Sequence, residues 1–142
     1  MKTITFLSVL FLLSFQAKAQ SEKTVNLTLE FEVKENDKGS ILCGIYKSAE
    51  NFMDTEKIFR AGSAEFKDKK ARIIIKDLPR GFYGFSYYHD VNANGKLDTN
   101  FVGVPKEPYG FSNGEKGRFG PPSFDDAKFK IQNDTIIKFK IK

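Results

Sequence analysis

The sequence has few of the residues that build the commonest metal and catalytic centres. Its 142 residues include one cysteine, one histidine and no tryptophan. The lone Cys43 excludes an internal disulfide bond, and one histidine with one cysteine falls short of the usual zinc ligand set. Cys43 lies in the apolar segment 41–45, which predicts a buried, unreactive side chain. We expect His89 to end a strand and to orient Asp90 or a neighbouring carbonyl.

Long hydrophobic runs are absent beyond the N-terminus. Lys2 precedes an apolar run over residues 5–15, and Ala17 and Ala19 occupy the positions that a signal peptidase reads. The run is too short to span a bilayer as a permanent helix. We therefore expect residues 1–19 to be a signal peptide that is cleaved after Ala19. The mature chain is then periplasmic or secreted and is not inserted in a membrane.

A strong charge of one sign is also lacking. The chain has 23 basic and 18 acidic residues, and most lysines alternate with apolar residues or lie in turns. No basic stripe for nucleic acid is expected from this pattern. Gln20 stands where a lipoprotein would need cysteine, so we expect no lipid anchor. The mature segment 20–142 has the length of a single domain with one core.

Helical periodicity is weak, and a two-residue alternation of apolar and polar side chains predicts strands instead. The clearest alternation covers residues 25–33. Further predicted strands cover residues 40–46, 61–66, 71–76, 82–89, 128–131 and 135–141. We expect one hairpin from the first two strands, another from the last two, and a short helix or irregular loop over residues 48–59. The pattern predicts an all-β fold, an antiparallel β-sandwich.

Between residues 90 and 126 the alternation gives way to glycine, proline, asparagine and acidic residues. Ordered loops of this length are often functional. The opening segment 90–98 matches the first half of a calcium-binding loop, in which oxygen ligands occupy alternate positions. The predicted ligands are Asp90, Asn92, Asn94, the carbonyl of Lys96, and Asp98. Gly95 would make the sharp turn, and Leu97 would pack into the core.

The match ends at the twelfth position, where Phe101 replaces the bidentate glutamate. A complete EF-hand is therefore excluded. Glu107, Asp125 or Asp126 could supply the missing ligand, and we include Glu107 in the predicted site. A site with so few charges is expected to bind calcium weakly, at roughly 0.1 to 1 mM. The alternative interpretation is a plain Asn-Gly turn, which favours the same residue types.

Three segments of this loop carry a resemblance to a known family. They begin with His-Asp-Val-Asn-Ala-Asn-Gly-Lys at residues 89–96, Gly-Val-Pro-Lys-Glu-Pro-Tyr-Gly at 103–110 and Gly-Pro-Pro-Ser-Phe-Asp-Asp-Ala at 120–127. In combination they resemble the bacterial family catalogued as domain of unknown function 2141, over essentially the whole mature chain. The resemblance implies an exported β-sandwich with one long ordered loop. It carries over no activity.

A second resemblance concerns architecture. A strand, a Leu-Pro-x-Gly turn within residues 77–81 and a tyrosine-containing strand after it are similar to the corresponding parts of transthyretin-like, or prealbumin-type, sandwiches. A transthyretin-like or immunoglobulin-like sandwich is what this likeness implies.

Two classes of function fit these features. In the first, a non-catalytic exported module uses its calcium-ordered loop to present aromatic rings to carbohydrate or protein at the cell envelope. Those rings belong to Tyr109, Phe111, Phe119 and Phe124, and they could instead form a small core at the end of the sandwich. In the second, a secreted, glycosidase-like hydrolase uses Glu107, Asp125 and Asp126 as acid and base. We favour the first and expect no enzymatic activity.

Overall fold

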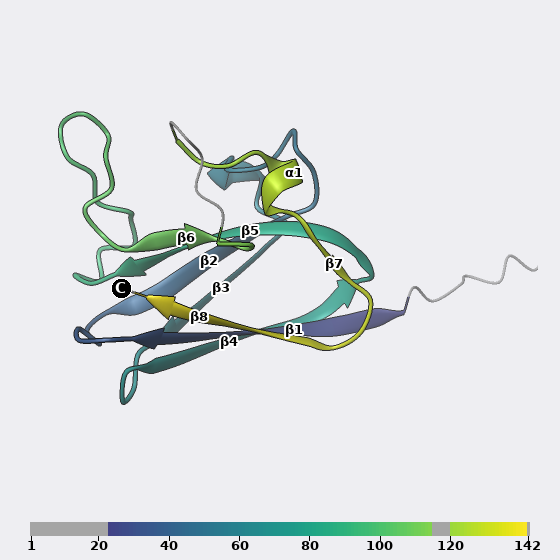
Figure 1. Ribbon diagram of the computed structural model, residues 1–142, viewed down its shortest axis with the longest axis horizontal. Helices are drawn as coiled ribbons and strands as arrows, with labels where there is room; N and C mark the ends of the chain where they lie inside the picture. The colour runs from purple at the N-terminus through teal and green to yellow at the C-terminus, as the bar shows by residue number, and fades with distance from the viewer. Residues whose placement is uncertain (1–22, 115–119, 142) are drawn as a thin grey trace, which may run out of the picture.

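The computed structural model describes residues 23–114 and 120–141, and there the chain forms two β-sheets packed face to face (Figure 1). The strands are β1 (Thr24–Val33), β2 (Ser40–Tyr46), β3 (Arg60–Glu65), β4 (Lys70–Pro79), β5 (Gly81–Asp90), β6 (Tyr109–Phe111), β7 (Phe129–Ile131) and β8 (Thr135–Ile141). One sheet has the order β4-β1-β8 and the other β3-β2-β5-β6, with β7 also paired to β5. The predicted all-β sandwich is confirmed. The predicted signal peptide, residues 1–19, lies outside the described residues.

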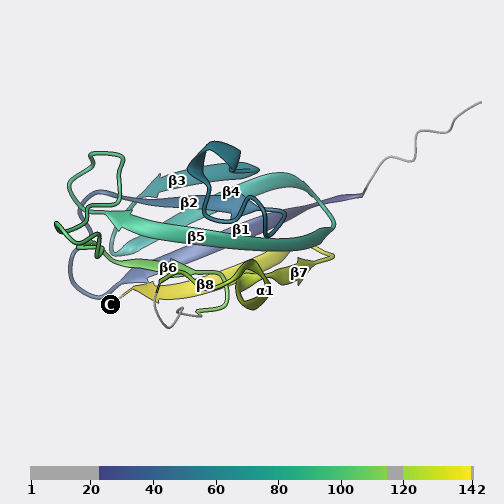
Figure 2. The same cartoon turned by 90° about the horizontal axis from the view of Figure 1, so that it is seen from above.

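The core lies between the two sheets, as the alternating pattern predicts. Leu27, Leu29 and Phe31 of β1 are buried, while the residues between them are partly exposed. Phe31 reaches across the core, because its ring contacts Phe139 on its own sheet and Tyr87 on the facing one at centroid distances of 5.2 and 5.0 Å. Figure 2 looks onto the sheet that contains β5, with the second sheet beneath it. Such aromatic contacts hold the two layers together.

Cys43 belongs to this core. Its side chain is buried, and burial raises the pKa of its thiol to about 12. The thiolate is therefore scarce near neutral pH, which agrees with the predicted buried side chain.

The predicted hairpin of residues 25–33 with 40–46 is wrong. β1 pairs with β4 and β8, whereas β2 pairs with β3 and β5. The connection between β1 and β2 thus passes from one sheet to the other. Alternation specifies which face of a strand is buried, and both sheets bury a face against the same core, so the pattern does not specify the neighbour.

The predicted C-terminal hairpin is wrong for the same reason. β7 pairs antiparallel with β5, and β8 pairs with β1 in the opposite sheet. The β1–β8 pair is parallel, so the sandwich is not purely antiparallel. The inward and outward faces of β8 are nevertheless as expected, because Lys138 and Lys140 are exposed and Ile141 is buried.

The predicted turn over residues 77–81 is shorter in the structure, because β4 continues to Pro79 and β5 begins at Gly81. Asp77 adopts a positive φ of 56° within β4. The hydroxyl of Tyr83 donates a hydrogen bond to the carbonyl of Pro79 at 2.5 Å, which ties the start of β5 to the end of β4. This contact has the form of the tyrosine corner found in Greek-key sandwiches.

The connection between β2 and β3 has little regular structure. Residues 48–54 form turns, followed by a 3-10 helix, η1 (Thr55–Lys57). The side chain of Asp54, not Ser48, caps η1 by accepting the N–H of Glu56. Of the two predicted alternatives, the irregular loop describes this segment better. No helix within residues 23–114 and 120–141 is long and apolar enough to cross a membrane.

Candidate functional site

The candidate loop begins where β5 ends, at Asp90. This aspartate is only 2% exposed, and its two carboxylate oxygens accept the backbone N–H groups of Asn94 at 3.0 Å and Gly95 at 2.7 Å. Ala93 and Gly95 have positive φ values of 56° and 76°, so the chain curls tightly around the carboxylate. The predicted turn at Gly95 is confirmed. Both oxygens of the buried carboxylate therefore have hydrogen-bond donors in the turn that follows β5.

The side-chain amides of Asn92 and Asn94 both contact the carboxylate of Asp98. The amide nitrogens of Asn92 and Asn94 donate to the two oxygens of the Asp98 carboxylate at 2.7 and 3.0 Å. The amide oxygens face the loop backbone, because that of Asn92 accepts the N–H of Asn94 and that of Asn94 accepts the N–H of Lys96. The arrangement therefore pairs the Asp98 charge with amide donors.

Glu107 closes the loop from outside the motif. It is 9% exposed, and its two oxygens accept the backbone N–H groups of Val91 at 2.9 Å and Asp98 at 3.0 Å. A backbone bond from the N–H of Lys106 to the carbonyl of Asp98 supports the same closure. Of the three acids that could complete the motif, Glu107 is therefore the one that folds back onto it.

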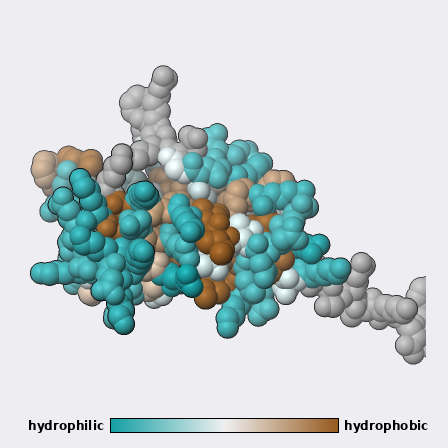
Figure 3. Space-filling view, turned by 60° about the horizontal axis from the view of Figure 1, so that its bottom comes forward, coloured by the Kyte–Doolittle hydropathy of each residue, from teal (hydrophilic) through white to brown (hydrophobic). Residues whose placement is uncertain are grey.

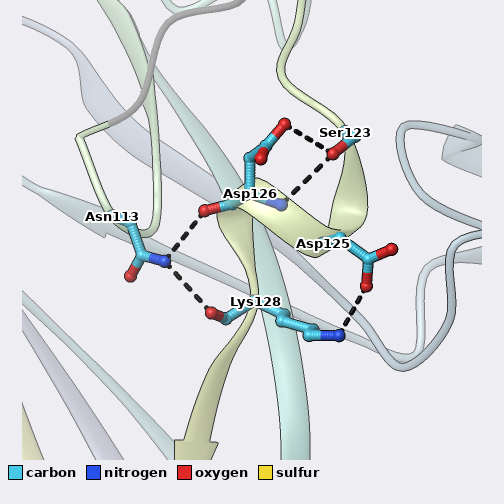
Figure 4. Close-up of polar contacts among 5 residues, drawn as sticks. All are labelled: Asn113, Ser123, Asp125, Asp126 and Lys128. Carbon is cyan, nitrogen blue, oxygen red and sulfur yellow. Dashed lines mark hydrogen bonds and ion pairs between the residues drawn. The ribbon is translucent and has the colours of Figure 1, made fainter.

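Asp125 and Asp126 lie elsewhere, in the short helix α1 (Phe124–Ala127). Figure 4 shows that the hydroxyl of Ser123 caps α1 by accepting the N–H of Asp126 and also donates to the Asp126 carboxylate, while Asp125 pairs with Lys128. The amide of Asn113 donates to the carbonyls of Asp126 and Lys128, so it fastens the end of β6 to this segment. Both acids serve the local structure of α1.

The position of α1 separates these two acids from Glu107. Phe124 packs against Gly84 of β5, six residues before Asp90 along the strand, which corresponds to roughly 20 Å of extended chain. Glu107 contacts the opposite end of β5 through Val91. The acid and base pair considered for a hydrolase is therefore not formed between Glu107 and either aspartate.

Negative charge is concentrated at the base of the loop. The hydroxyl of Tyr88 donates to the carbonyl of Gly95 at 3.1 Å. Burial, followed by the charges of Asp90 and Glu107, raises the pKa of the Tyr88 phenol. Even so, no three His, Cys, Asp or Glu side chains in the described part of the chain gather as a metal-binding group. Any cation in this loop would need amide and backbone oxygens as well.

His89 supports the loop from the neighbouring strand position. Its Nε2 lies 2.7 Å from the carbonyl of Lys38, and its ring packs on Phe66 at a centroid distance of 4.6 Å. Its backbone N–H donates to the carbonyl of Pro108. These contacts agree with the predicted supporting role beside a carbonyl. Leu97 does not pack in the core as expected, because the loop projects from the sandwich and leaves this side chain half-buried.

Of the aromatic side chains predicted to meet a ligand, most of those that the structure describes form a small core at the end of the sandwich and are not presented to a ligand. Phe111 and Phe124 are buried, and only Tyr109 is exposed, at 42%; Phe119 lies outside the described residues. The ring of Phe124 packs against Phe52 at 5.6 Å. The loop instead exposes Phe101 and its apolar neighbours, which sequence reasoning missed. Their signal in the sequence is an apolar segment between two polar ones.

Ser112 is a second residue that sequence reasoning missed. It lies at the centre of a Gly-x-Ser-x-Gly segment, residues 110–114, the spacing of a nucleophile elbow. Its hydroxyl is buried, donates to the carbonyl of Ala127 and accepts the N–H of Phe85. The segment begins within strand β6 and leads into a turn, not a helix. Ser112 therefore joins β5 to the end of α1, and it is not placed as a nucleophile.

Comparisons with known proteins identify a family. No curated protein and no solved structure matches the chain. A family model described as "Uncharacterized protein conserved in bacteria (DUF2141)" matches residues 30–138. This span contains most of the sandwich and all of the loop from Asp90 to Glu107. The chain therefore belongs to this bacterial family, as the loop segments predicted.

Proposed function

We propose that the protein is a non-catalytic module of the bacterial cell envelope whose loop 90–98, closed by Glu107, binds calcium and thereby stiffens the segment that meets a partner. The observation that carries the proposal is the enclosure of the buried Asp90 carboxylate by a loop whose Asn92, Asn94 and Asp98 side chains touch one another. A plain Asn-Gly turn does not require these three side chains to meet.

The residues present have the oxygen chemistry that calcium prefers. Calcium takes about six to eight oxygen ligands, from carboxylates, amide and backbone carbonyls, and water. Asp90, Asp98 and Glu107 offer carboxylate oxygens, and the carbonyl of Lys96 supplies the backbone ligand of the motif. The amides of Asn92 and Asn94 would turn over, so that their oxygens replace the nitrogens now facing Asp98. A bound cation would then take the place of these two amide donors as the partner of Asp98.

The position of the loop fits a binding module. The carboxylates of Asp90 and Glu107 accept backbone N–H groups, and that of Asp98 accepts the side-chain amides of Asn92 and Asn94, so all three are engaged within the loop itself. Export is supported by the charge, apolar run and small residues of the segment 1–19. A partner at the cell envelope, whether carbohydrate, protein or lipid, would meet the loop outside the sandwich.

Calorimetry with calcium and with magnesium tests this function. We expect the purified protein to bind calcium at roughly 0.1 to 1 mM, with a weaker response to magnesium, and the Asp90→Asn variant to lose that heat. The matched control is Asp77→Asn, which removes one charge from an exposed position near the end of β4 and should bind as the wild type does. Circular dichroism checks that both variants fold. Absence of a calcium heat in the wild-type protein would reject the proposal.

A further inference from the structure

The loop carries an exposed apolar tip, formed by Phe101, Val102 and Val104. Phe101 is 99% exposed, and Val102 and Val104 are 66% and 54% exposed. Figure 1 shows the connection between β5 and β6 standing away from the sheets, and Figure 3 shows hydrophobic surface at the same edge of the molecule. Most other large apolar side chains of the chain line its core. Burying these three as well would lower the free energy by removing their apolar surface from water. Their exposure points to an external apolar partner.

Hydrogen bonds within the tip fix its backbone conformation. The side-chain oxygen of Asn100 accepts the backbone N–H groups of Val102 at 3.0 Å and Val104 at 2.9 Å. The N–H of Asn100 donates to the carbonyl of Val104, and that of Gly103 donates to the carbonyl of Asn100. The turn is therefore built around Asn100, with Phe101 and Val102 at its outermost point. An ordered tip loses less conformational freedom when it binds.

The most exposed charges of this loop are positive. Lys96 and Lys106 are exposed and Asp98 is half-buried, whereas Asp90 and Glu107 are buried with their oxygens bound to backbone N–H groups. Residues 90–108 contain three acidic and two basic residues, a formal charge of −1 that one divalent cation would reverse. The apolar tip thus stands between two lysines, an arrangement that attracts an anionic surface.

We propose that this tip is a membrane-surface anchor: Phe101 and Val102 enter the interfacial layer of an anionic lipid bilayer, and Lys96 and Lys106 face its headgroups. The inference assigns the partner of the loop, and it rests on the proposed function only for its dependence on calcium. Interfacial binding needs protruding apolar side chains together with cations. A carbohydrate or other small ligand needs a concave site, and a stable protein interface covers about 800 Å² per partner, which a convex tip with three apolar side chains does not offer.

Vesicle sedimentation tests the anchor. The full chain is mixed with vesicles of equal parts phosphatidylcholine and phosphatidylglycerol, or of phosphatidylcholine alone, in calcium or in EDTA. We expect binding to the anionic vesicles that strengthens in calcium. The double variant Phe101→Ser, Val102→Ser should bind at least about tenfold more weakly than the wild type, since two large apolar contacts are lost. Each of Lys96→Gln and Lys106→Gln should weaken binding about fivefold.

The matched control is Ile136→Ser. Ile136 is 62% exposed on β8, so the variant removes a similar apolar surface away from the loop, and its vesicle binding should equal that of the wild type. Equal binding of the double variant and this control overturns the anchor, as does the absence of wild-type binding to anionic vesicles. Tip-dependent binding together with no calcium heat in calorimetry supports the anchor while removing the calcium function. A calcium heat without tip-dependent vesicle binding supports the calcium function and overturns the anchor.

Discussion

Glu107 accepts the backbone N–H of Asp98 at 3.0 Å through one carboxylate oxygen. The other oxygen accepts the N–H of Val91, so one side chain holds both flanks of the candidate loop. A residue outside the calcium motif therefore closes it, where a complete EF-hand would use the twelfth position. The apolar tip lies between the two residues of this contact, which fixes the base from which the tip projects.

Replacing Glu107 should loosen the loop without unfolding the sandwich. In Glu107→Ala, two backbone N–H groups lose their acceptors, so we expect the free energy of unfolding to fall by about 1 to 3 kcal/mol. Glu107→Gln keeps one acceptor oxygen and should lose less. Urea denaturation followed by circular dichroism measures the loss, and hydrogen exchange should show faster exchange at the amides of Val91 and Asp98. Unchanged exchange at both amides in Glu107→Ala would contradict the closure.

Gly39 is expected to be intolerant of a side chain. It has a positive φ of 75°, and a Cβ at this position would overlap the backbone carbonyl of Asp90. Gly103 has a similar φ of 82° but open space around it. Gly103→Ala should therefore cost about 1 to 2 kcal/mol through backbone strain alone, whereas Gly39→Ala should cost clearly more. Equal denaturation midpoints for the two variants would show that the contact with Asp90 is not tight.

Glu30 should make stability depend on pH. The hydrogen bond from Arg72, at 2.6 Å, and the nearby Lys138 hold the pKa of this carboxyl below its usual 4.5. The stabilising contribution is therefore present above the unfolded pKa and is lost as the pH falls through the lowered folded pKa. We expect Glu30→Gln to be less stable than the wild type at neutral pH and equal to it in strong acid. Urea denaturation over a pH series measures this difference, which high salt should shrink.

Cys43 should resist modification in the folded protein. Its buried thiol has a pKa of about 12, and only the thiolate reacts with alkylating reagents. We expect slow labelling by iodoacetamide under native conditions at mildly alkaline pH, and fast labelling in urea. Fast native labelling, at the rate of a free thiol, would mean that the β2 region opens readily. Arg60→Ala, an exposed change on β3, serves as the control and should leave the rate unchanged.

The sequence predicted the loop better than it predicted the sheets. Alternate oxygen side chains and Gly95 identify the turn, because the hydrogen bonds within residues 90–98 are local and join residues at most six apart, as Asn92 and Asp98 are. Glu107 was one of three candidates, and only the course of β6 beside β5 brings it back. The exposed tip was missed because apolar residues predict burial unless the backbone holds them away from the core.

The sequence by itself determined most of the strands and the face that each of them buries, since both follow from a two-residue period and the removal of apolar side chains from water. The exception is β6, which lies in the segment without alternation. The sequence also determined the local turn around Asp90. The tertiary structure decided the strand neighbours, including the parallel pairing of β8 with β1 and the separation of β1 from β2. Such pairings depend on backbone hydrogen bonds, which every residue except proline can form alike, and on the twist and packing of two whole sheets.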